Sequence, residues 1–374
     1  MNLTPSDEQR MMGDAADRLA GAMAEGSEPL RYWQELAQLG WLGLPFAEEY
    51  GGSAAGMQEI ASLMRAFGKH RISQPYVTTV VLCGHLVQQL GTPAQRDLVL
   101  PRITAGELTL ALAALEPQQG DQLRNPLTVA RRGQCCWVLD GRKALSLGAP
   151  DAEMLLVTAS IEGGGLGVFL VKKGTTGLSL KAHETVFGLP AADVHLQEVT
   201  VSADAILGDG DDASEALESA VDRAAAALCA DAAGTMRWLL ESTAEYLKTR
   251  SQFGRPLATF QALQHRLAEM AVACEESEGM ALLALLGAEA DTTKRVRAVC
   301  SAKLKIGKAS RFVAQHAVQL HGAMGVTEEL PIAAGFKRLM GFESLFGTTA
   351  TQQDRYTALL KSNVATTSIL SDGN

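Results

Sequence analysis

The sequence predicts an α+β protein in which a helical N-terminal segment, a strand-rich middle segment and a helical C-terminal segment follow one another. Apolar residues recur at helical spacing before Leu108, and short alternating runs separated by glycines fill the next hundred or so residues. Long amphipathic helical patterns return from Ala213. We therefore expect three domains, at 1–108, 109–212 and 213–374.

Composition places the chain among ordinary globular proteins, with 374 residues, 47% of them hydrophobic and 20% charged. The 33 basic and 42 acidic residues give a net charge of −9, which argues against nucleic acid or an anionic membrane as a partner. No apolar run is long enough to span a bilayer, and the acidic N-terminus is unlike a secretory signal. We expect a cytoplasmic protein without a membrane span.

The six cysteines show neither a CxxC motif nor metal-ligand spacing, and the seven histidines include no HExxH motif. The cysteines are therefore expected to be buried, reduced thiols of a cytosolic protein. We expect no metal site.

The helical N-terminal segment is expected to contain four stretches with apolar residues at helical spacing: 7–25, 29–44, 57–70 and 78–91. In the middle segment, Asp140-Gly141 predicts a turn between two strand-like runs within 135–147. Further strands are expected in four short runs, 154–160, 167–173, 177–183 and 193–201, and the middle segment is expected to form an antiparallel β domain.

The C-terminal segment is expected to form a four-helix bundle, because its long helical patterns carry continuous apolar stripes. The clearest patterns are 235–250, 262–274 and 296–320. Most such stripes pack within their own domain, and a subunit interface is the alternative.

The junction between two of these helices carries Arg250 and Phe253 before a Gly-Arg-Pro turn, and Gln261 opens the next helix. An arginine beside an exposed aromatic ring suits a ligand with a phosphate and an attached ring. The alternative is that Arg250 caps helix carbonyls while Phe253 lies in the core. Spacing alone favours the alternative.

A second motif, "QLHGAMGVTEELP" at 319–331, ends a helix in a loop of small residues. Gly322, Ala323 and Gly325 would allow a ligand to approach the backbone. Such a loop is weak evidence by itself, because many only end a helix. His321 is expected to be a structural hydrogen-bonding residue rather than a base.

Together these motifs make the chain resemble the flavin-dependent acyl-CoA dehydrogenase family over its whole length. The matching pieces follow in order: "LGWLGLPFAEEYGG", "LPRITAGE", "EPQQGD", "LDGRKAL", "RSQFGRPLATFQ" and "QLHGAMGVTEELP". The stretch "GFKRLMGFESLFG" most resembles small subunits of pimeloyl-CoA-type and steroid-side-chain-type heteromeric dehydrogenases.

The resemblance implies FAD as cofactor, an acyl-CoA thioester as substrate and an electron-transfer flavoprotein as redox partner. In the family a glutamate removes the α proton and the flavin accepts the β hydride, within a tetramer of subunits with helical, β and four-helix domains. The residues that would contact a partner subunit's FAD are Arg250, Phe253, Gln261, Gln319, Gly322 and Ala323, the last standing where a second glycine is usual. Thr348 would also contact the cofactor.

Several family residues that serve a subunit's own flavin are replaced. Leu115 replaces a threonine that forms a hydrogen bond to the flavin in the family, and Asp121 replaces a serine that forms a hydrogen bond to its pyrophosphate. The stretch "KALSL" lacks the usual aromatic-x-Thr pattern. A carboxylate beside a pyrophosphate is unfavourable at low dielectric. The catalytic Glu-Gly-Thr reads Phe346-Gly347-Thr348.

A relocated base has two candidate places. Glu343, three residues before Phe346, is a weak candidate. Some family members carry the base on the first helix of the C-terminal domain, where this chain has Ala224. Asp222, two residues earlier, is turned about 200° around that helix. Arg223 is a weak candidate for binding substrate.

Two hypotheses follow. The chain is a base-lacking subunit of a heterotetramer with a second acyl-CoA dehydrogenase-like subunit, or it is a self-sufficient homomeric dehydrogenase with a relocated base. The first is favoured, because the residues donated to a neighbour are kept while those serving the chain's own flavin are lost. A non-enzymatic binding or regulatory subunit is a further alternative.

Overall fold

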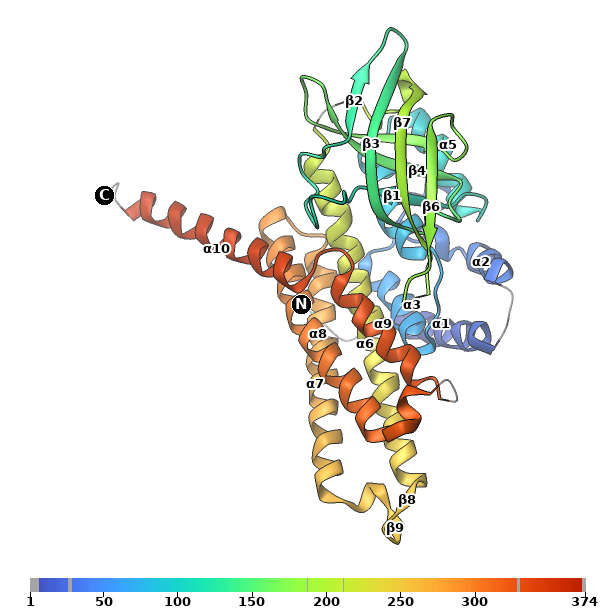
Figure 1. Ribbon diagram of the computed structural model, residues 1–374, viewed down its shortest axis with the longest axis vertical. Helices are drawn as coiled ribbons and strands as arrows, with labels where there is room; N and C mark the ends of the chain where they lie inside the picture. Colours follow the sequence, from blue (N-terminus) through green and yellow to red (C-terminus); the bar gives the residue numbers. More distant parts are fainter. Residues whose placement is uncertain (1–6, 26–28, 187, 211, 328–329, 372–374) are drawn as a thin grey trace. The chain divides into compact units, whose positions relative to one another are not determined.

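The computed structural model describes residues 7–25, 29–186, 188–210, 212–327 and 330–371 (Figure 1). Its internal contacts divide the chain into two compact units. The sheet unit comprises Glu28–Gly56 and Ser73–Ala224, and the helical unit comprises Met1–Ser27, Met57–Ile72 and Ala225–Asn374. Each unit is described by itself below.

Apart from the first turns of α6, the longer helical segments of the sheet unit precede its strands. They are α2 (Pro29–Gln38), a π-helical segment (Val77–Gly84), α4 (His85–Leu90) and α5 (Pro93–Thr104). Thr92 begins α5 with a capping box: its hydroxyl accepts from the Gln95 backbone N–H, and the Gln95 side chain accepts from the Thr92 N–H. The buried Tyr76 hydroxyl donates to the Trp41 carbonyl at 3.0 Å, which ties the helical segments together.

Seven strands form one sheet in the order β1-β4-β2-β3-β7-β6, with β5 paired to β4. Their bounds are β1 (Leu110–Ala113), β2 (Val129–Arg132), β3 (Cys136–Leu147), β4 (Met154–Ile161), β5 (Leu166–Lys172), β6 (Leu178–His183) and β7 (Ala191–Ser202). The sheet is mixed rather than wholly antiparallel as expected, because β4 runs parallel to β1 and β2. The β2–β3 hairpin between β1 and β4 supplies the long connection that a parallel pair requires.

The predicted turn at Asp140-Gly141 is wrong, because β3 continues through it as one strand. The register against β7 shifts between Leu139 and Gly141, which is a β-bulge. The Asp140 carboxylate accepts the backbone N–H of Glu198 at 2.7 Å across that bulge. Aspartate followed by glycine therefore serves here to bend a strand rather than to reverse it.

The core of the sheet unit is built from the inward faces of these strands. Trp137 and Phe169 pack edge to face with ring centroids 5.4 Å apart, surrounded by buried aliphatic residues such as Leu155 and Val157. Each such side chain contributes about 1.5–3 kcal/mol when fully buried.

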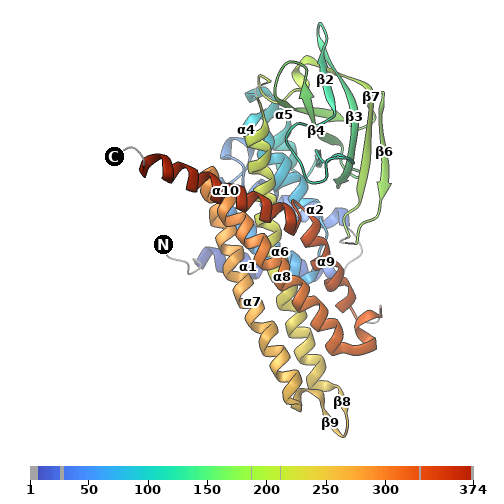
Figure 2. The same ribbon diagram turned by 60° about the vertical axis from the view of Figure 1, so that its left-hand side comes forward.

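The helical unit contains α1 (Asp7–Glu25), α3 (Met57–His70), most of α6 (Ser214–Thr249), α7 (Gln261–Gly287), α8 (Thr292–His321), α9 (Ile332–Ser344) and α10 (Thr349–Ser371). The long helices α6, α7 and α8 run alongside one another in Figures 1 and 2. Asp291 accepts from the Lys294 backbone N–H and so begins α8. The predicted order of helical, β and helical segments is confirmed.

Candidate functional site

The junction between α6 and α7 is an exposed hairpin at one end of the helical unit (Figure 1). Strands β8 (Ser251–Gln252) and β9 (Arg255–Pro256) flank Phe253 and Gly254, whose φ angles are 54° and 78°. Two positive φ values in a two-residue hairpin define a tight turn whose twist suits the flanking strands.

Phe253 is 88% exposed, so the interpretation that it lies in a core is wrong. Arg250 is also exposed, and its side chain makes no hydrogen bond or ion pair within the described part of the chain. Its backbone carbonyl accepts from the Leu257 N–H at 2.8 Å, which closes the base of the hairpin. The guanidinium and the aromatic ring are thus held out from the helices, available to a ligand or a neighbouring chain.

The end of α8 converges on the same end of the helical unit. The buried His321 ring stacks on Tyr246 of α6 at 4.4 Å, and its Nδ1 donates to the Ala317 carbonyl at 2.8 Å. Burial lowers the pKa of His321. This packing supports the expected structural role of His321.

Because Tyr246 lies one turn before Arg250 and Gly322 directly follows His321, the two predicted motifs meet in space. Every predicted donor to a partner's cofactor at this end is exposed: Arg250, Phe253, Gln261, Gln319, Gly322 and Ala323. The structure therefore brings together the residues that the two motifs contribute.

The loop between α9 and α10 holds Phe346, which was predicted to stand at the position of the family's base. Phe346 has a φ of 53°, a left-handed conformation that is unfavourable for a bulky side chain. The buried Lys303 ammonium donates to the carbonyls of Phe342 and Leu345, both at 2.7 Å. Gln352 donates to the Phe346 carbonyl at 3.0 Å. The strained loop is thus fixed by side chains from α8 and α10.

Gly347 is required by the loop itself. Its φ is 96°, and a Cβ placed on it would lie 2.3 Å from the Gln352 side-chain nitrogen. Thr348, predicted to contact the cofactor, accepts from the Thr351 backbone N–H at 3.3 Å and so caps the start of α10.

Glu343 is already engaged within the helical unit. One carboxylate oxygen accepts from Arg311 at 2.5 Å and the other from the Thr349 hydroxyl at 3.1 Å. A base needs a lone pair directed at the substrate proton. Each oxygen of Glu343 already accepts one of these contacts within the helical unit, and no contact among the described residues directs the carboxylate elsewhere. The geometry does not support Glu343 as a base.

In the sheet unit, the loop that carries Leu115 and Asp121 is anchored by a buried ion pair that we did not predict. Lys143 of β3 donates to Glu116 at 2.7 Å, and the side chains are 0% and 2% exposed. The backbone N–H groups of Leu127 and Thr128 donate to Glu116 at 2.6 and 2.9 Å.

Opposing effects act on the Glu116 carboxyl. Burial alone would raise its pKa, but hydrogen bonds from Lys143 and Thr128 outweigh burial and lower it. Burial also lowers the pKa of Lys143, to about 8. Both residues lie in motifs that carry the family resemblance, yet only the fold shows that they pair.

The sheet unit fits a flavin poorly through its side chains. Leu115 lies beside β3, since its carbonyl accepts from the Ala144 N–H at 2.8 Å, and Leu145 in that strand is 42% exposed. Neither leucine side chain offers a hydrogen bond to the polar edge of an isoalloxazine ring. The half-buried Asp121 places a carboxylate in the loop that would face a pyrophosphate.

The first turns of α6 supply no base either. Ala224 and Asp222 are completely buried, and Arg223 is half-buried. Alanine has no proton acceptor. The structure gives no contact that assigns substrate binding to Arg223.

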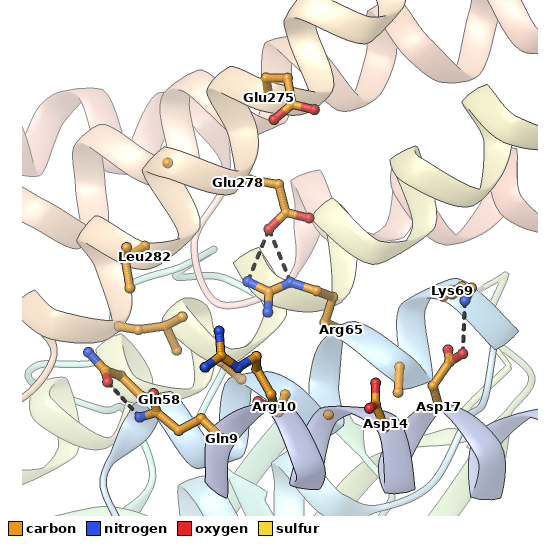
Figure 3. Close-up of a pocket in the computed structure, with 16 residues that line it drawn as sticks. Gln9, Arg10, Asp14, Asp17, Gln58, Arg65, Lys69, Glu275, Glu278 and Leu282 are labelled. Atoms are coloured by element: carbon orange, nitrogen blue, oxygen red, sulfur yellow. Dashed lines mark hydrogen bonds and ion pairs between the residues drawn. The ribbon is translucent and has the colours of Figure 1, made fainter. Parts of the chain in front are cut away.

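A groove of 860 Å³ in the helical unit lies between α1, α3 and α7, and none of the predicted site residues lines it (Figure 3). Its charges largely neutralise one another: Arg65 pairs with Glu278 at 3.0 Å and Lys69 pairs with Asp17 at 2.9 Å. It is therefore not the candidate active site.

Among the described residues, no cluster of three or more histidine, cysteine, aspartate or glutamate side chains has a geometry suited to a metal ion. No helix within those same ranges is both long and apolar enough to cross a membrane.

Comparisons with known proteins match this architecture. Sequence models of the acyl-CoA dehydrogenase N-terminal, middle and C-terminal domains match residues 6–107, 111–201 and 214–358. FadE12, an acyl-CoA dehydrogenase of Mycobacterium tuberculosis (strain ATCC 25618 / H37Rv), is 31% identical over 81% of this chain and 80% of its own length. The acryloyl-CoA reductase (NADH) of Anaerotignum propionicum is 27% identical over 86% and 84%.

Among solved structures, a variant of the Tcur3481-Tcur3483 steroid ACAD is 30% identical, with a TM-score of 0.85 over 96% of this chain and 99% of that one. The likeness therefore extends through all three segments of the chain in both sequence and fold. On this evidence the chain belongs to the acyl-CoA dehydrogenase family.

Proposed function

We propose that this chain is the base-lacking subunit of a heterotetrameric, FAD-dependent acyl-CoA dehydrogenase. The observation that carries the proposal is the presence of phenylalanine at position 346. It occupies the place of the family's glutamate in a loop that still holds a strained, left-handed backbone. The frame of a catalytic loop is kept, and its proton acceptor is absent.

The helical unit would serve a flavin held by the partner subunit. Arg250 and Phe253 are exposed and lie at the same end as Gln319 and Gly322. A guanidinium beside an aromatic ring suits a pyrophosphate with an attached adenine. Arg250 and Phe253 would bind and orient FAD there, and the cofactor would supply the acceptor for the hydride of the β carbon.

The sheet unit also supports a difference in role between the two kinds of subunit, in which only the partner holds a flavin. Leu115 and Leu145 provide no side-chain hydrogen bond to a flavin, and Asp121 adds a negative charge where a pyrophosphate would lie. The chain would thus complete one active site of the assembly and leave its own without flavin. The steroid ACAD named above carries two component names, which is consistent with an enzyme of two kinds of subunit.

The remaining partners follow from the proposed reaction. The substrate would be an acyl-CoA thioester whose α proton is removed by a carboxylate of the partner subunit. Reducing equivalents would leave through an electron-transfer flavoprotein in the cytoplasm.

Restoring the missing carboxylate should not restore activity to the isolated chain. The Phe346→Glu variant is expected to fold, because glutamate meets the same backbone conformation as phenylalanine, and to oxidise no acyl-CoA, because Leu115 and Asp121 still oppose a flavin. The measurement is reduction of an artificial electron acceptor with acyl-CoA, with Phe346→Gln as a matched variant without a base. Turnover by Phe346→Glu that Phe346→Gln lacks would contradict the proposal.

A further inference from the structure

Two directly adjacent cysteines lie at the tip of the hairpin between β2 and β3, in the sheet unit. Cys135 is exposed, and Cys136, the first residue of β3, is half-buried. The backbone N–H of Gly133 donates to the Cys136 carbonyl at 2.8 Å, so Gln134 and Cys135 form the bend between the two strands. The expectation that every cysteine is buried is therefore wrong for this pair.

The Cys136 sulfur lies over the turn of the hairpin. A Cβ placed on Gly133 would stand 2.7 Å from Cys136 Sγ, so the absence of a side chain at Gly133 leaves room for the thiol. Trp137, the next residue of β3, belongs to the core of the sheet unit. Because successive side chains of a strand point to opposite faces, the Cys136 thiol faces away from that core, toward the surface that also carries Cys135.

The other four cysteines are protected by their surroundings. They are all buried: Cys83, Cys229, Cys274 and Cys300. Burial raises the pKa of the Cys83, Cys229 and Cys274 thiols. The Cys300 thiol donates to the Gln352 side-chain oxygen at 3.0 Å. Since an accessible thiolate is the form that attacks a disulfide, reaction at the surface of the folded chain is expected at Cys135 and Cys136.

We propose that Cys135 and Cys136 form a thiol–disulfide exchange site for low-molecular-weight disulfides, in which Cys135 attacks and Cys136 resolves. The Cys135 thiolate attacks one sulfur of the small disulfide, whose S–S bond breaks, and one small thiolate leaves. The Cys136 thiolate then attacks the Cys135 sulfur, joins the two cysteines and releases the second small thiolate. Each protein thiol gives up one proton and each departing thiolate takes one up. Two protein thiols are thus oxidised while one small disulfide is reduced to two thiols.

The resulting bridge would be a reversible one. Adjacent Cα atoms stand about 3.8 Å apart across a trans peptide, whereas most disulfides join Cα atoms about 4.4–6.8 Å apart. A bridge between neighbours is therefore less stable than an ordinary structural disulfide, and small thiols should reopen it. The site would be closed under oxidising conditions and open under reducing conditions. It does not depend on the proposed role of the chain in dehydrogenation.

The test incubates the folded, full-length chain with glutathione disulfide and follows the products by mass spectrometry of the intact chain and of its peptides. The natural chain should lose two hydrogens, with Cys135 and Cys136 joined in one peptide. Dithiothreitol should then restore the starting mass. The same incubation in denaturant, where all six thiols are accessible, shows that the reagent reacts with each of them once it is exposed.

Serine variants separate the two roles and should fold, because both cysteines lie outside the core. Cys136→Ser should stop at a mixed disulfide between Cys135 and glutathione, since the resolving thiol is absent. Cys135→Ser should react roughly tenfold more slowly or less, because the remaining surface thiol of Cys136 is half-buried. Cys300→Ser is the matched control at a buried thiol and should give the same products as the natural chain.

A closed bridge in the natural chain together with a mixed disulfide in Cys136→Ser would support the proposal. It is overturned if the folded natural chain keeps all its thiols, or if it retains the mixed disulfide to the same extent as Cys136→Ser. It is also overturned if Cys135→Ser reacts as fast as the natural chain.

Discussion

Replacing Lys143 by methionine is expected to lower the free energy of unfolding by about 3–5 kcal/mol. The Lys143 ammonium is fully buried and donates to Glu116 at 2.7 Å, to Thr158 at 3.0 Å and to the Ala114 carbonyl at 3.3 Å. Methionine has a similar length but no charge, so the Glu116 carboxylate would stay buried without its counter-ion. Denaturant unfolding measures the loss.

The matched control is a double variant, Lys143→Met with Glu116→Leu, which removes both charges. It should recover part of the loss, because an apolar pair can replace a buried ion pair at little cost. The decrease in the free energy of unfolding caused by Lys143→Met should also be smaller at acid pH. Hydrogen bonds keep the folded pKa of Glu116 below its ordinary value of 4.5, so its stabilisation is present above that value and disappears as the pH falls through the lower, folded pKa. A single variant as stable as the natural chain would contradict this account of the loop.

If the proposed heteromeric enzyme forms, replacing Arg250 by alanine should weaken its FAD binding roughly tenfold or more, since a charge-assisted contact to a phosphate would be lost. The fold should be unaffected, because this exposed side chain makes no contact with described residues that stabilises it. The measurement is the flavin content of the complex after dialysis, together with its Tm.

Lys248→Ala is the matched control for Arg250→Ala. It removes an exposed cation from the same end of α6, and among the described residues its ion pair is with Glu245, three residues away. Flavin content should stay unchanged in this variant. If Arg250→Ala retained as much flavin as Lys248→Ala, Arg250 would not contact the cofactor.

Much of the fold could be predicted because periodicity reports which face of an element is buried. The helices at 57–70 and 296–320 and the strands at 154–160 and 193–201 correspond to α3, α8, β4 and β7. The turn at Asp140-Gly141 could not be predicted correctly, because the same dipeptide serves a hairpin or a bulge and only the pairing with β7 decides between them. The mixed sheet likewise depends on pairing between distant segments.

The candidate site could be predicted less well than the fold, because side-chain exposure and contacts between distant residues depend on the folded chain. Spacing favoured a buried Phe253, whereas the tight turn at Phe253-Gly254 holds the ring in solvent. Glu116 and Lys143 are 27 residues apart, and nothing in their local sequence indicates that they meet. Glycine is required at position 347 because a Cβ there would collide with the side chain of Gln352, and only the fold reveals this contact. The proposed loss of the base rests, in contrast, on the sequence itself, which has Phe346 where the family motif has glutamate.

The most direct test of the proposed role is the visible absorption spectrum of the purified chain, recorded alone and after co-expression with a second acyl-CoA dehydrogenase-like subunit. The account predicts a colourless isolated chain that oxidises no acyl-CoA. It also predicts a yellow, active complex with fewer flavins than subunits. A homo-oligomer of this chain that is yellow and oxidises an acyl-CoA would contradict it.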